Sequence, residues 1–303
     1  MGAGFAYVNG TYVPARTAQI SVLDPGFTRS DAVYDVTSVW KGLFFRLDEH
    51  IERFLASCRG TQITCPLTPL EIRRVLATCV IKGDVTDAAY VAIVATRGNY
   101  LDEVASRERD IFRTRPTMIA YARPYIWIAN PETQNRGLHL IVARTPRIPD
   151  VCVNTKFKNY HWGDLTRGKF EAKEAGADAA VHLSIDGFLT EGAGFNIFFA
   201  RDGRLFTPAR NVLFGVTRAA TIDLAAELGI PVEVGDYTAD ELRSADEAFM
   251  TSTAGGIMPI ATLDGSRFRQ DRQPGPISLS FRSRYWQRRE EGWCGTPVKD
   301  ALA

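Results

Sequence analysis

The amino-acid sequence predicts an α+β protein of two domains, and three observations lead to this prediction. The chain has 303 residues, 45% hydrophobic and 23% charged, which is enough for two ordinary folded domains. Apolar runs typical of strands occur in both halves together with amphipathic helices. The pattern changes near Arg123-Pro124, where we expect an interdomain linker. We therefore predict an N-terminal domain over 1–122, a linker over 123–129 and a C-terminal domain over 130–303.

In the first domain, turn residues and helix caps divide the chain into elements. Asn9-Gly10 predicts a tight hairpin turn, because both residue types tolerate the positive φ angles that such a turn requires. Thr68-Pro69-Leu70-Glu71 is a capping box with proline at the first helical position, and it predicts a helix that runs to Gly83. We expect the polar segment 97–115 to be a functional loop. The other expected elements are strands over 6–8, 11–13, 20–23, 33–40, 43–45, 90–95 and 118–121, and a helix over 51–58 with Gly60 at its end.

The second domain has similar signals. Asp186-Gly187 and Asp202-Gly203 predict turns between strands. Thr238-Ala239-Asp240-Glu241 is a second capping box, and Gly229 predicts the end of the helix before it. The expected strands are 138–143, 179–183, 188–189, 195–200, 248–250 and 257–263, and the expected helices are 217–228 and 276–289.

Charge and cysteine content exclude several classes of protein. Lys and Arg total 36 against 35 Asp and Glu, so the net charge favours neither nucleic acid nor an anionic membrane as partner. No apolar run reaches the ~18 residues that would cross a bilayer. The five cysteines share no Cys-x-x-Cys spacing and the four histidines no His-x-x-x-His pattern, so we expect neither a disulfide framework nor a metal site. These features predict a reduced, cytoplasmic protein of the size of an enzyme.

Four segments combine glycine or asparagine with chemically active side chains: Lys158-Asn159, Glu191-Gly192-x-Gly194-x-Asn196, Gly215-Val216-Thr217-Arg218 and Ser252-Thr253-Ala254-Gly255-Gly256. The third places glycine before a helix N-terminus, where free backbone N–H groups can hold a phosphate. The second precedes a strand, whereas the glycine loop of a dinucleotide-binding fold opens a helix. Taken singly, each segment has an ordinary structural explanation; an isolated lysine among aromatic residues usually extends along them to water.

The order of these segments resembles that of the fold-type IV pyridoxal-phosphate-dependent aminotransferases, which include the branched-chain and D-amino acid aminotransferases. Residues 30–36 and 45–53 extend the resemblance, which runs from about residue 7 to residue 286. With Lys158-Asn159-x-x-Trp162-Gly163-Asp164-Leu165, the chain is most similar to the (R)-selective amine transaminases. The resemblance implies pyridoxal 5'-phosphate at the domain junction. It also implies at least a homodimer, because the pocket of this family takes residues from a neighbouring subunit.

The same resemblance implies roles for cofactor-binding residues. Lys158 would join the cofactor aldehyde and act as general base, with Lys156 as its competitor. Glu191 would keep the pyridine nitrogen protonated, and Arg53 would pair with the phosphate. The remaining contacts would come from backbone N–H groups, hydroxyls and one apolar side chain on the ring: Val216, Thr217, Ser252, Thr253 and Leu213.

Substrate residues are also implied. An arginine of the segment 107–110, Arg109 first and Arg107 second, would meet the carboxylate of the amino-group acceptor. Arg29 stands where amine transaminases usually have histidine, and Ala92 where glutamate is frequent, so carboxylate-bearing substrates are favoured. The walls of the pocket would come from Tyr34, Val36, Tyr90, Trp162 and Ala254.

The expected activity is ping-pong transfer of an amino group from an (R)-amine or a D-amino acid to a keto acid such as pyruvate. Within the same fold, D-amino acid or branched-chain aminotransferase activity is the alternative. An aminodeoxychorismate lyase, which eliminates pyruvate instead, is a further alternative. A protein that binds the cofactor without turnover is an alternative from another class.

Overall fold

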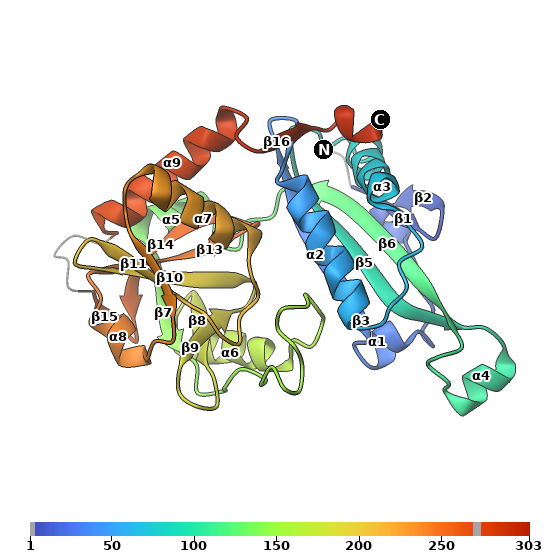
Figure 1. Cartoon of the computed structure of the whole chain (residues 1–303), viewed down its shortest axis with the longest axis horizontal. Coiled ribbons are helices and arrows are strands. Elements are labelled where there is room, and N and C mark those ends of the chain that lie inside the picture. Colours follow the sequence, from blue (N-terminus) through green and yellow to red (C-terminus); the bar gives the residue numbers. More distant parts are fainter. Residues whose placement is uncertain (1–3, 269–273) are drawn as a thin grey trace. The chain divides into compact units, whose positions relative to one another are not determined.

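A computed structural model describes residues 4–268 and 274–303, and its contacts divide the chain into two compact units (Figure 1). Unit 1 comprises Met1–Ile126, Phe157–Tyr160 and Arg289–Ala303, and unit 2 comprises Trp127–Lys156 and His161–Arg288. The chain leaves the first unit after Ile126, within the segment predicted as the linker. Two segments differ from the sequence-based limits, because Phe157–Tyr160 and Arg289–Ala303 pack with unit 1 and not with the rest of the C-terminal domain.

Unit 1 is built on a seven-stranded antiparallel sheet with the order β16-β4-β3-β5-β6-β1-β2. Its strands are β1 (Phe5–Val8), β2 (Thr11–Pro14), β3 (Ala32–Trp40), β4 (Leu43–Phe45), β5 (Ala88–Tyr100), β6 (Thr114–Pro124) and β16 (Gly295–Pro297). Its helices are η1 (Ala15–Thr17), α1 (Pro25–Thr28), α2 (Leu47–Gly60), α3 (Pro69–Lys82), α4 (Glu103–Glu108) and η2 (Asp300–Leu302).

Successive side chains of β3 point to opposite faces of the sheet in unit 1, and the two faces differ. Val33 and Val39 join the main core of the unit together with Phe54 of α2 and Leu76 of α3. Figure 1 shows α2 running along this sheet. The intervening residues of β3, which include Tyr34, point to the opposite face. The candidate substrate residues of β3 therefore lie on the face that α2 and α3 leave uncovered.

Local signals in unit 1 are confirmed. Asn9 and Gly10 have φ angles of 45° and 96°, as the hairpin turn requires. Thr68 and Glu71 form the predicted capping box, and α3 ends with Gly83 as its C-cap. Helix α2 begins earlier than predicted, at Leu47, and Gly60 is its last residue.

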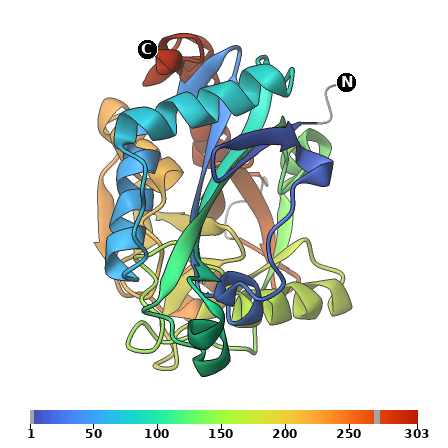
Figure 2. The same cartoon turned by 90° about the vertical axis from the view of Figure 1, so that its right-hand side faces the viewer.

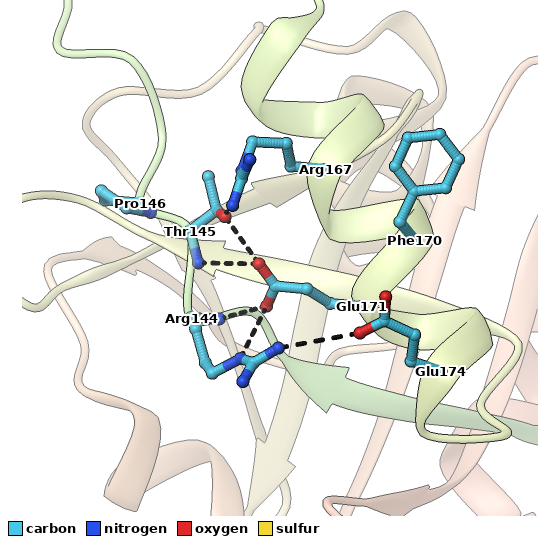
Figure 3. A pocket seen from close by; sticks show the side chains of 7 residues that line it. All are labelled: Arg144, Thr145, Pro146, Arg167, Phe170, Glu171 and Glu174. Carbon is cyan, nitrogen blue, oxygen red and sulfur yellow. Dashed lines mark hydrogen bonds and ion pairs between the residues drawn. The ribbon is translucent and has the colours of Figure 1, made fainter.

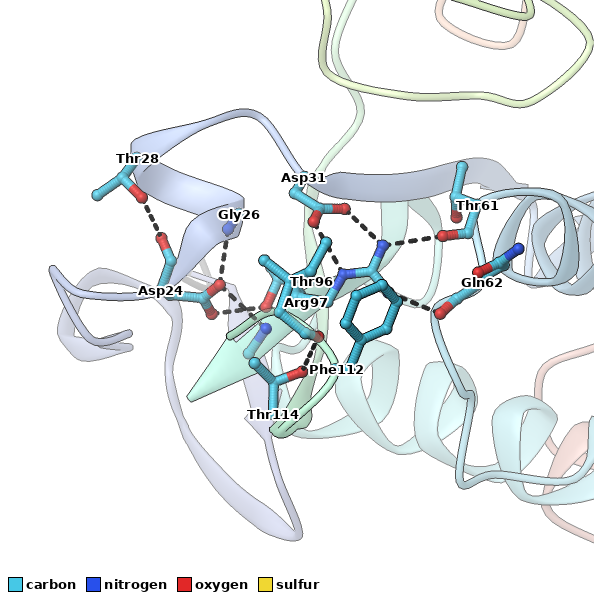
Figure 4. A network of polar contacts seen from close by, with 12 residues as sticks. Asp24, Gly26, Thr28, Asp31, Thr61, Gln62, Thr96, Arg97, Phe112 and Thr114 are labelled. Carbon is cyan, nitrogen blue, oxygen red and sulfur yellow. Dashed lines mark hydrogen bonds and ion pairs between the residues drawn. The ribbon is translucent and has the colours of Figure 1, made fainter. Parts of the chain in front are cut away.

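The predicted strand over 20–23 is wrong, because this segment has no partner strand and its apolar side chains are exposed, Val22 by 72%. Buried Asp24 fixes the chain here in place of a strand. Its carboxylate accepts hydrogen bonds from the backbone N–H of Gly26 (2.7 Å) and from the hydroxyl of Thr96 (2.6 Å), as Figure 4 shows. It also accepts one from the backbone N–H of Gly98 (3.1 Å). A buried carboxylate with three donors holds a turn against β5 where alternation alone predicts a strand.

The segment 97–115, expected as a loop, is largely a hairpin. Strand β5 continues to Tyr100 and β6 begins at Thr114, with a bulge between Thr96 and Asn99. Helix α4 lies between the strands, at the far tip of the hairpin (Figures 1 and 2). Asp102 caps this helix through the Ala105 N–H.

Unit 2 is built on a nine-stranded sheet with the main order β12-β11-β10-β13-β14-β7-β8-β9. Its strands are β7 (Leu138–Val142), β8 (Ala179–Leu183), β9 (Leu189–Gly192), β10 (Phe195–Arg201), β11 (Arg204–Pro208), β12 (Val232–Gly235), β13 (Glu247–Ser252), β14 (Gly256–Leu263) and β15 (Ser266–Arg267). Its helices are α5 (Pro131–Arg136), α6 (Gly163–Glu174), α7 (Val216–Glu227), α8 (Ala239–Arg243) and α9 (Pro276–Glu290), of which α9 ends in unit 1.

The sheet of unit 2 closes on itself, because β9 pairs with both β8 and β10. Alternate side chains of β10, including Ile197 and Phe199, form one core with Met250 of β13. On the other face of β10, Phe198 stacks on Phe249, which stacks on Phe281 of α9. Unit 2 is thus a barrel with an apolar interior, and an additional aromatic layer packs outside it.

The predictions for unit 2 are confirmed where local signals exist. The second capping box, Thr238 with Glu241, begins α8, and the predicted helix 217–228 is α7. The elements α5, α6, β11, β12 and β15 were not predicted. Within the described ranges, no helix has the length and apolarity needed to cross a membrane.

Candidate functional site

Both backbone groups of Lys158 are hydrogen-bonded within unit 1. Its N–H donates to the Ser57 hydroxyl at the end of α2 (3.0 Å), and its carbonyl accepts from the Tyr34 N–H on β3 (2.9 Å). The preceding ring of Phe157 packs on Gly60, where a Cβ atom would lie 2.1 Å from it. The Lys158 ammonium lies 4.6 Å from the centroid of the Tyr34 ring. The lysine segment is therefore fixed to α2 and β3 by backbone contacts that do not depend on its side chain.

Lys156, the competing lysine, has different surroundings. It belongs to unit 2, its side chain is exposed, and its ammonium lies 5.9 Å from the Phe214 ring. Lys158 is half-buried beside the predicted substrate residue Tyr34. The surroundings of the two lysines favour Lys158 as the reactive one.

Four tyrosines lie in the same part of unit 1. Tyr34 stacks on Tyr160, with ring centroids 4.3 Å apart, and Tyr90 stacks on Tyr121 at 6.3 Å. Burial raises the pKa of Tyr90, Tyr121 and Tyr160, so these hydroxyls stay protonated at neutral pH. Val36 points to the same face of β3 as Tyr34. Three predicted pocket residues thus share one sheet face with aromatic neighbours that the sequence analysis did not name.

Arg53 is tied to a buried carboxylate on the neighbouring strand. Its Nε and one terminal nitrogen donate to Asp35, at 2.7 and 2.9 Å, and the Nδ1 atom of His50 lies 2.7 Å from the same carboxylate. Burial would raise the pKa of Asp35, but the Arg53 charge and His50 together lower it. Burial lowers the pKa of His50, so this ring is neutral at pH 7. The Arg53 guanidinium is therefore oriented by an ionised, fully buried partner.

In unit 2, Glu191 lies on the short strand β9 and is 6% exposed. Its Oε1 atom accepts a hydrogen bond from Arg147 (2.9 Å). Its Oε2 atom accepts from the Leu213 N–H (2.9 Å) and, at 3.4 Å, from the Asn196 amide. A carboxylate offers about four acceptor positions, and the described residues use three of those on Glu191.

Asn196 connects three of the predicted segments. It pairs with Glu191 across β9 and β10, and its amide also donates to the Leu213 carbonyl (2.8 Å). A Cβ atom at Gly215 would lie 2.1 Å from its Oδ1 atom. Only glycine therefore fits beside Asn196 at the start of α7, and this contact brings the glutamate, the apolar residue and the helix N-terminus together.

Arg147 and Asp164 extend the Glu191 network. Arg147 bridges the two carboxylates, at 2.5 Å to Asp164 and 2.9 Å to Glu191. Asp164 also accepts from the backbone N–H groups of Ile148 and Leu165. Burial would raise the pKa of Asp164, but these amides and Arg147 lower it. The arginine is therefore held in place from one side while it contacts Glu191 on the other.

The N-terminus of α7 carries two predicted residues, Val216 and Thr217, both buried. Gly215 is its N-cap, and no side chain caps the first amides. Ser252 donates to the Gly194 carbonyl (2.8 Å) and accepts from the Ala254 N–H (3.2 Å). The uncapped amides suit an anion, whereas the Ser252 hydroxyl already orders the turn that contains Thr253 and Ala254.

Several predicted residues lie apart from these networks. Arg109 is the exposed C-cap of α4, and Arg107 pairs with Glu103 on the same short helix. Arg29 is exposed at the end of α1. Trp162 is the N-cap of α6 in unit 2. Within unit 1, the loop arginines do not lie among the tyrosines.

Sequence reasoning missed five residues that hold the candidate site together. Asp35, His50, Asp164 and Asn196 stand inside the motifs that were recognised, so their positions were available although their partners were not. Arg147 had no signal beyond a charged side chain.

A hollow of about 570 Å³ on unit 2 contains none of the predicted residues (Figure 3). Glu171 of α6 lines this hollow. It accepts hydrogen bonds from the backbone N–H groups of Arg144 and Thr145 and from the Thr145 hydroxyl. These bonds attach α6 to the end of β7, which is a structural role. Among residues 4–268 and 274–303, no His, Cys, Asp and Glu side chains group as metal ligands would.

Comparison with protein families identifies one match. The family model described as amino-transferase class IV matches residues 32–263. A Methanocaldococcus jannaschii protein, provisionally named a branched-chain-amino-acid aminotransferase, is 32% identical over 281 residues, covering 92% of this chain and 94% of that protein. A D-alanine aminotransferase of Listeria monocytogenes is 30% identical over 279 residues, covering 90% and 92%.

Solved structures agree with the fold. A branched-chain aminotransferase of Thermoproteus uzoniensis, crystallised with norvaline, superimposes with a TM-score of 0.87 at 28% identity and covers 98% of this chain and 100% of its own. The branched-chain amino acid aminotransferase of Thermobaculum terrenum, in its holo-form with pyridoxal phosphate, gives a TM-score of 0.85 at 25% identity, with coverage of 98% and 99%. The predicted two-domain α+β fold is confirmed.

Proposed function

Because this chain belongs to the class IV aminotransferase family, we propose that it is a pyridoxal-phosphate-dependent transaminase. The observation that carries the proposal is the arrangement around Glu191. Three donors fix this buried carboxylate, and one acceptor position remains. That position suits the protonated nitrogen of a pyridine ring. The related Thermobaculum terrenum structure, which contains pyridoxal phosphate, supports the same cofactor here.

The chain's residues fit the remaining parts of the cofactor. Lys158 supplies a half-buried amine whose backbone is fixed. Arg53 and the uncapped amides of Val216 and Thr217 supply donors for a phosphate. Leu213, whose backbone is bonded to Glu191, would pack on the ring. Ser252 and Thr253 would complete the phosphate site with hydroxyls.

Bound pyridoxal phosphate supplies an electron sink that lets the Cα–H bond of an amine substrate break. The chain's own groups manage the proton. The Nζ atom of Lys158 would take the proton from Cα and return it beyond the amine nitrogen, in a 1,3-shift. Glu191, held by Arg147, would keep a proton on the ring nitrogen. Tyr34, beneath the lysine ammonium, limits the positions that Nζ can adopt.

The amino donor is proposed to be an (R)-amine or a D-amino acid, and the acceptor a keto acid such as pyruvate. The residue motifs around Tyr34 and Lys158 support this assignment, as does the similarity to a D-alanine aminotransferase. Tyr34, Val36, Tyr90, Trp162 and Ala254 would line the pocket. Branched-chain L-amino acids are the second candidate, because both structures described above are branched-chain aminotransferases.

Arg109 is proposed to bind the acceptor carboxylate, since an unpaired charge in an apolar pocket costs several kcal/mol. Its exposed position at the tip of the β5–β6 hairpin is consistent with service to a neighbouring subunit, so we also propose at least a homodimer. Arg109→Ala should cost about 2–4 kcal/mol of transition-state binding in the pyruvate half-reaction, with 1-phenylethylamine oxidation nearly unchanged. Arg107→Ala is the matched control, and an equal loss in both half-reactions would show that the loop is structural.

The proposed function is tested in two steps. Borohydride reduction of the protein loaded with pyridoxal phosphate, followed by peptide mapping, should label Lys158; label on Lys156, or on neither lysine, would contradict the proposal. Half-reactions followed by absorption then separate the activities. A donor alone should change the cofactor spectrum, and pyruvate should restore it.

The donor panel consists of both enantiomers of 1-phenylethylamine, D-alanine and L-leucine. Faster reaction of L-leucine would identify the branched-chain activity. Release of pyruvate from aminodeoxychorismate, without an acceptor, would identify the lyase. No response to any donor would identify a cofactor-binding protein without turnover.

A further inference from the structure

Arg123, near the end of β6, lies on the same sheet face of unit 1 as the tyrosines. On β6, Ala120 and Ala122 belong to the main core, so the alternating residues Tyr121 and Arg123 point to the opposite face. The register of the sheet pairs Arg123 with Tyr90 of β5. Arg123 therefore stands beside two tyrosines of the candidate site, on the face that α2 and α3 leave uncovered.

Two rows of side chains cross this face from β3 to β6. The strand registers define these rows as Val36–Ala92–Tyr121 and Ser38–Tyr90–Arg123. Neither row contains an acidic residue, so none of these side chains can neutralise the arginine. The predicted pocket residues Val36 and Tyr90 thus share their rows with a tyrosine and a cation.

The Arg123 guanidinium has no anionic partner in the part of the chain that the structure describes. Arg123 is exposed, and its side chain forms no hydrogen bond or ion pair with residues 4–268 or 274–303. Its positive charge opposes the rise that burial causes in the pKa of Tyr90 and of Tyr121. A guanidinium can donate two parallel hydrogen bonds to a carboxylate. The side chain is therefore available to a carboxylate that binds on this face.

Tyrosine rings connect this arginine with the lysine. The Lys158 ammonium lies 4.6 Å from the centroid of the Tyr34 ring, and Tyr34 stacks on Tyr160 at 4.3 Å. Tyr160 in turn interacts electrostatically with Tyr90 and Tyr121. A series of aromatic side chains thus leads across unit 1 from the lysine to the row that contains the arginine.

The strand registers show how far apart the two ends of this series are. Tyr34 pairs with Val94 of β5, and Arg123 pairs with Tyr90 of the same strand. These two residues of β5 are four positions apart, which corresponds to about 13 Å along the strand. A ligand that reaches from the lysine to the arginine must therefore be extended, and pyruvate is too short.

We propose that Arg123 is a specificity-determining residue that binds the second carboxylate of an extended dicarboxylic keto acid or amino acid. This inference rests on the proposed function, because the reacting carbon of such a substrate would lie at Lys158. The tyrosine rings would pack along its methylene chain, and the guanidinium would donate to its distal carboxylate. The role proposed for Arg109 concerns the other carboxylate, next to the reacting carbon.

The kinetic test measures kcat/KM for 2-oxoglutarate, 2-oxoadipate, 2-oxopimelate and 2-oxosuberate, each against the monocarboxylic 2-keto acid of equal chain length. The wild type should prefer the dicarboxylic acid at the longer chain lengths. Arg123→Gln should reduce this preference about 10–100-fold and leave the monocarboxylic acids unchanged, because a charged hydrogen-bond partner is lost. Arg123→Lys, which keeps the charge without the planar fork, should restore part of it.

The matched control is Arg16→Gln, which removes an exposed arginine of η1, after the edge strand β2. This variant should keep the wild-type preference. The inference is overturned if the wild type shows no preference for a dicarboxylic acid at any length, or if Arg123→Gln retains the preference.

A binding measurement separates this inference from the proposed function. Isothermal titration calorimetry on the protein loaded with pyridoxal phosphate compares suberate with octanoate, neither of which can accept an amino group. Suberate should bind the wild type about 10–100-fold more tightly than it binds Arg123→Gln, whereas octanoate should bind both equally. Equal binding of suberate to both proteins would refute the role of Arg123. If no keto acid supports turnover, the proposed function fails, and the calorimetry still decides whether Arg123 binds the carboxylate.

Discussion

Asp35 in unit 1 and Glu191 in unit 2 are both buried carboxylates beside an arginine, but their hydrogen bonding differs. Asp35 accepts four hydrogen bonds from the described residues: from its neighbour Val36, from His50, and twice from Arg53. Glu191 accepts three. The donors on Glu191 leave one of its about four acceptor positions open, on Oε1. On Asp35, three donors gather at Oδ1 and the Arg53 Nε atom binds Oδ2.

This difference separates a structural carboxylate from one that is suited to a ligand. Arg53 binds both oxygens of Asp35, so the role of Asp35 is to orient that guanidinium. Glu191 is held as firmly, by Arg147 and by backbone, yet can accept one more donor. Burial alone would not have distinguished them, because Asp35 is 1% and Glu191 6% exposed.

The largest effect on activity is expected from Glu191→Gln. Glutamine keeps the size of the side chain but cannot hold a positively charged ring nitrogen, so kcat should fall by about 10²–10³-fold. The variant should still fold, because glutamine can accept one of the existing hydrogen bonds. Steady-state kinetics with pyruvate and the preferred donor will measure the effect. A kcat within about twofold of the wild type would contradict the assignment of Glu191 as the carboxylate that binds a ligand.

Asp35→Asn is expected to act mainly on stability. Asparagine leaves Arg53 and His50 without an ionised partner, and the free energy of unfolding of unit 1 should fall by about 3 kcal/mol. Urea denaturation followed by tryptophan fluorescence measures this loss. The matched control is Asp31→Asn, which breaks the more exposed pair with Arg97 and should cost less, because solvent screens that pair more. Equal losses in the two variants would mean that the buried Asp35 network contributes no more to stability than the more exposed Asp31–Arg97 pair.

The smallest effect is on the pH dependence of stability, which should fall in two separate pH ranges. Burial lowers the pKa of His50 in unit 1 and of His182 in unit 2, so only the unfolded chain takes up these protons as the pH falls below about 6.5. Stability should therefore decrease from pH 7 to pH 5. The pKa of Asp35 is lowered in the folded chain, so its contribution is present above about pH 4 and is lost at lower pH.

Single substitutions show which residue causes the loss of stability in each pH range. His50→Gln should make the decrease between pH 7 and pH 5 shallower, and His182→Gln should do so independently in unit 2. Asp35→Asn should flatten the decrease below pH 4. Denaturation curves at each pH provide the measurement, and a stability that rises from pH 7 to pH 5 would contradict the sign for both histidines.

Local chemistry made much of the fold predictable. The capping boxes at Thr68 and Thr238 and the Asn9-Gly10 turn need only neighbouring residues, and all three are found. The alternating segment 20–23 misled because a strand needs a partner, and Asp24 fixes the chain differently. Closure of the barrel depends on pairing between distant strands, which alternation does not encode.

In the candidate site too, some residues could be predicted from their sequence neighbours and others could not. Motif order identified Lys158 and Glu191, because their neighbours in sequence are distinctive. It did not identify Arg147, which lies 44 residues from Glu191 and has no motif of its own. Nor did it reveal that Asp35 binds Arg53 from a different element. Partners of this kind become visible only when the strand and helix positions are known.

The closing strand of the barrel has one further consequence. Strand β9 is short, and its pairing places Glu191 opposite Asn196. Side chains alternate along a strand, so a slip of one residue would turn Glu191 to the other face of the sheet. The position of this carboxylate is consequently an all-or-none property: insertions in the turn at 193–194 should not shift it gradually but eliminate it. Library designs for this protein can vary the tyrosine-bearing sheet while leaving that turn at its present length.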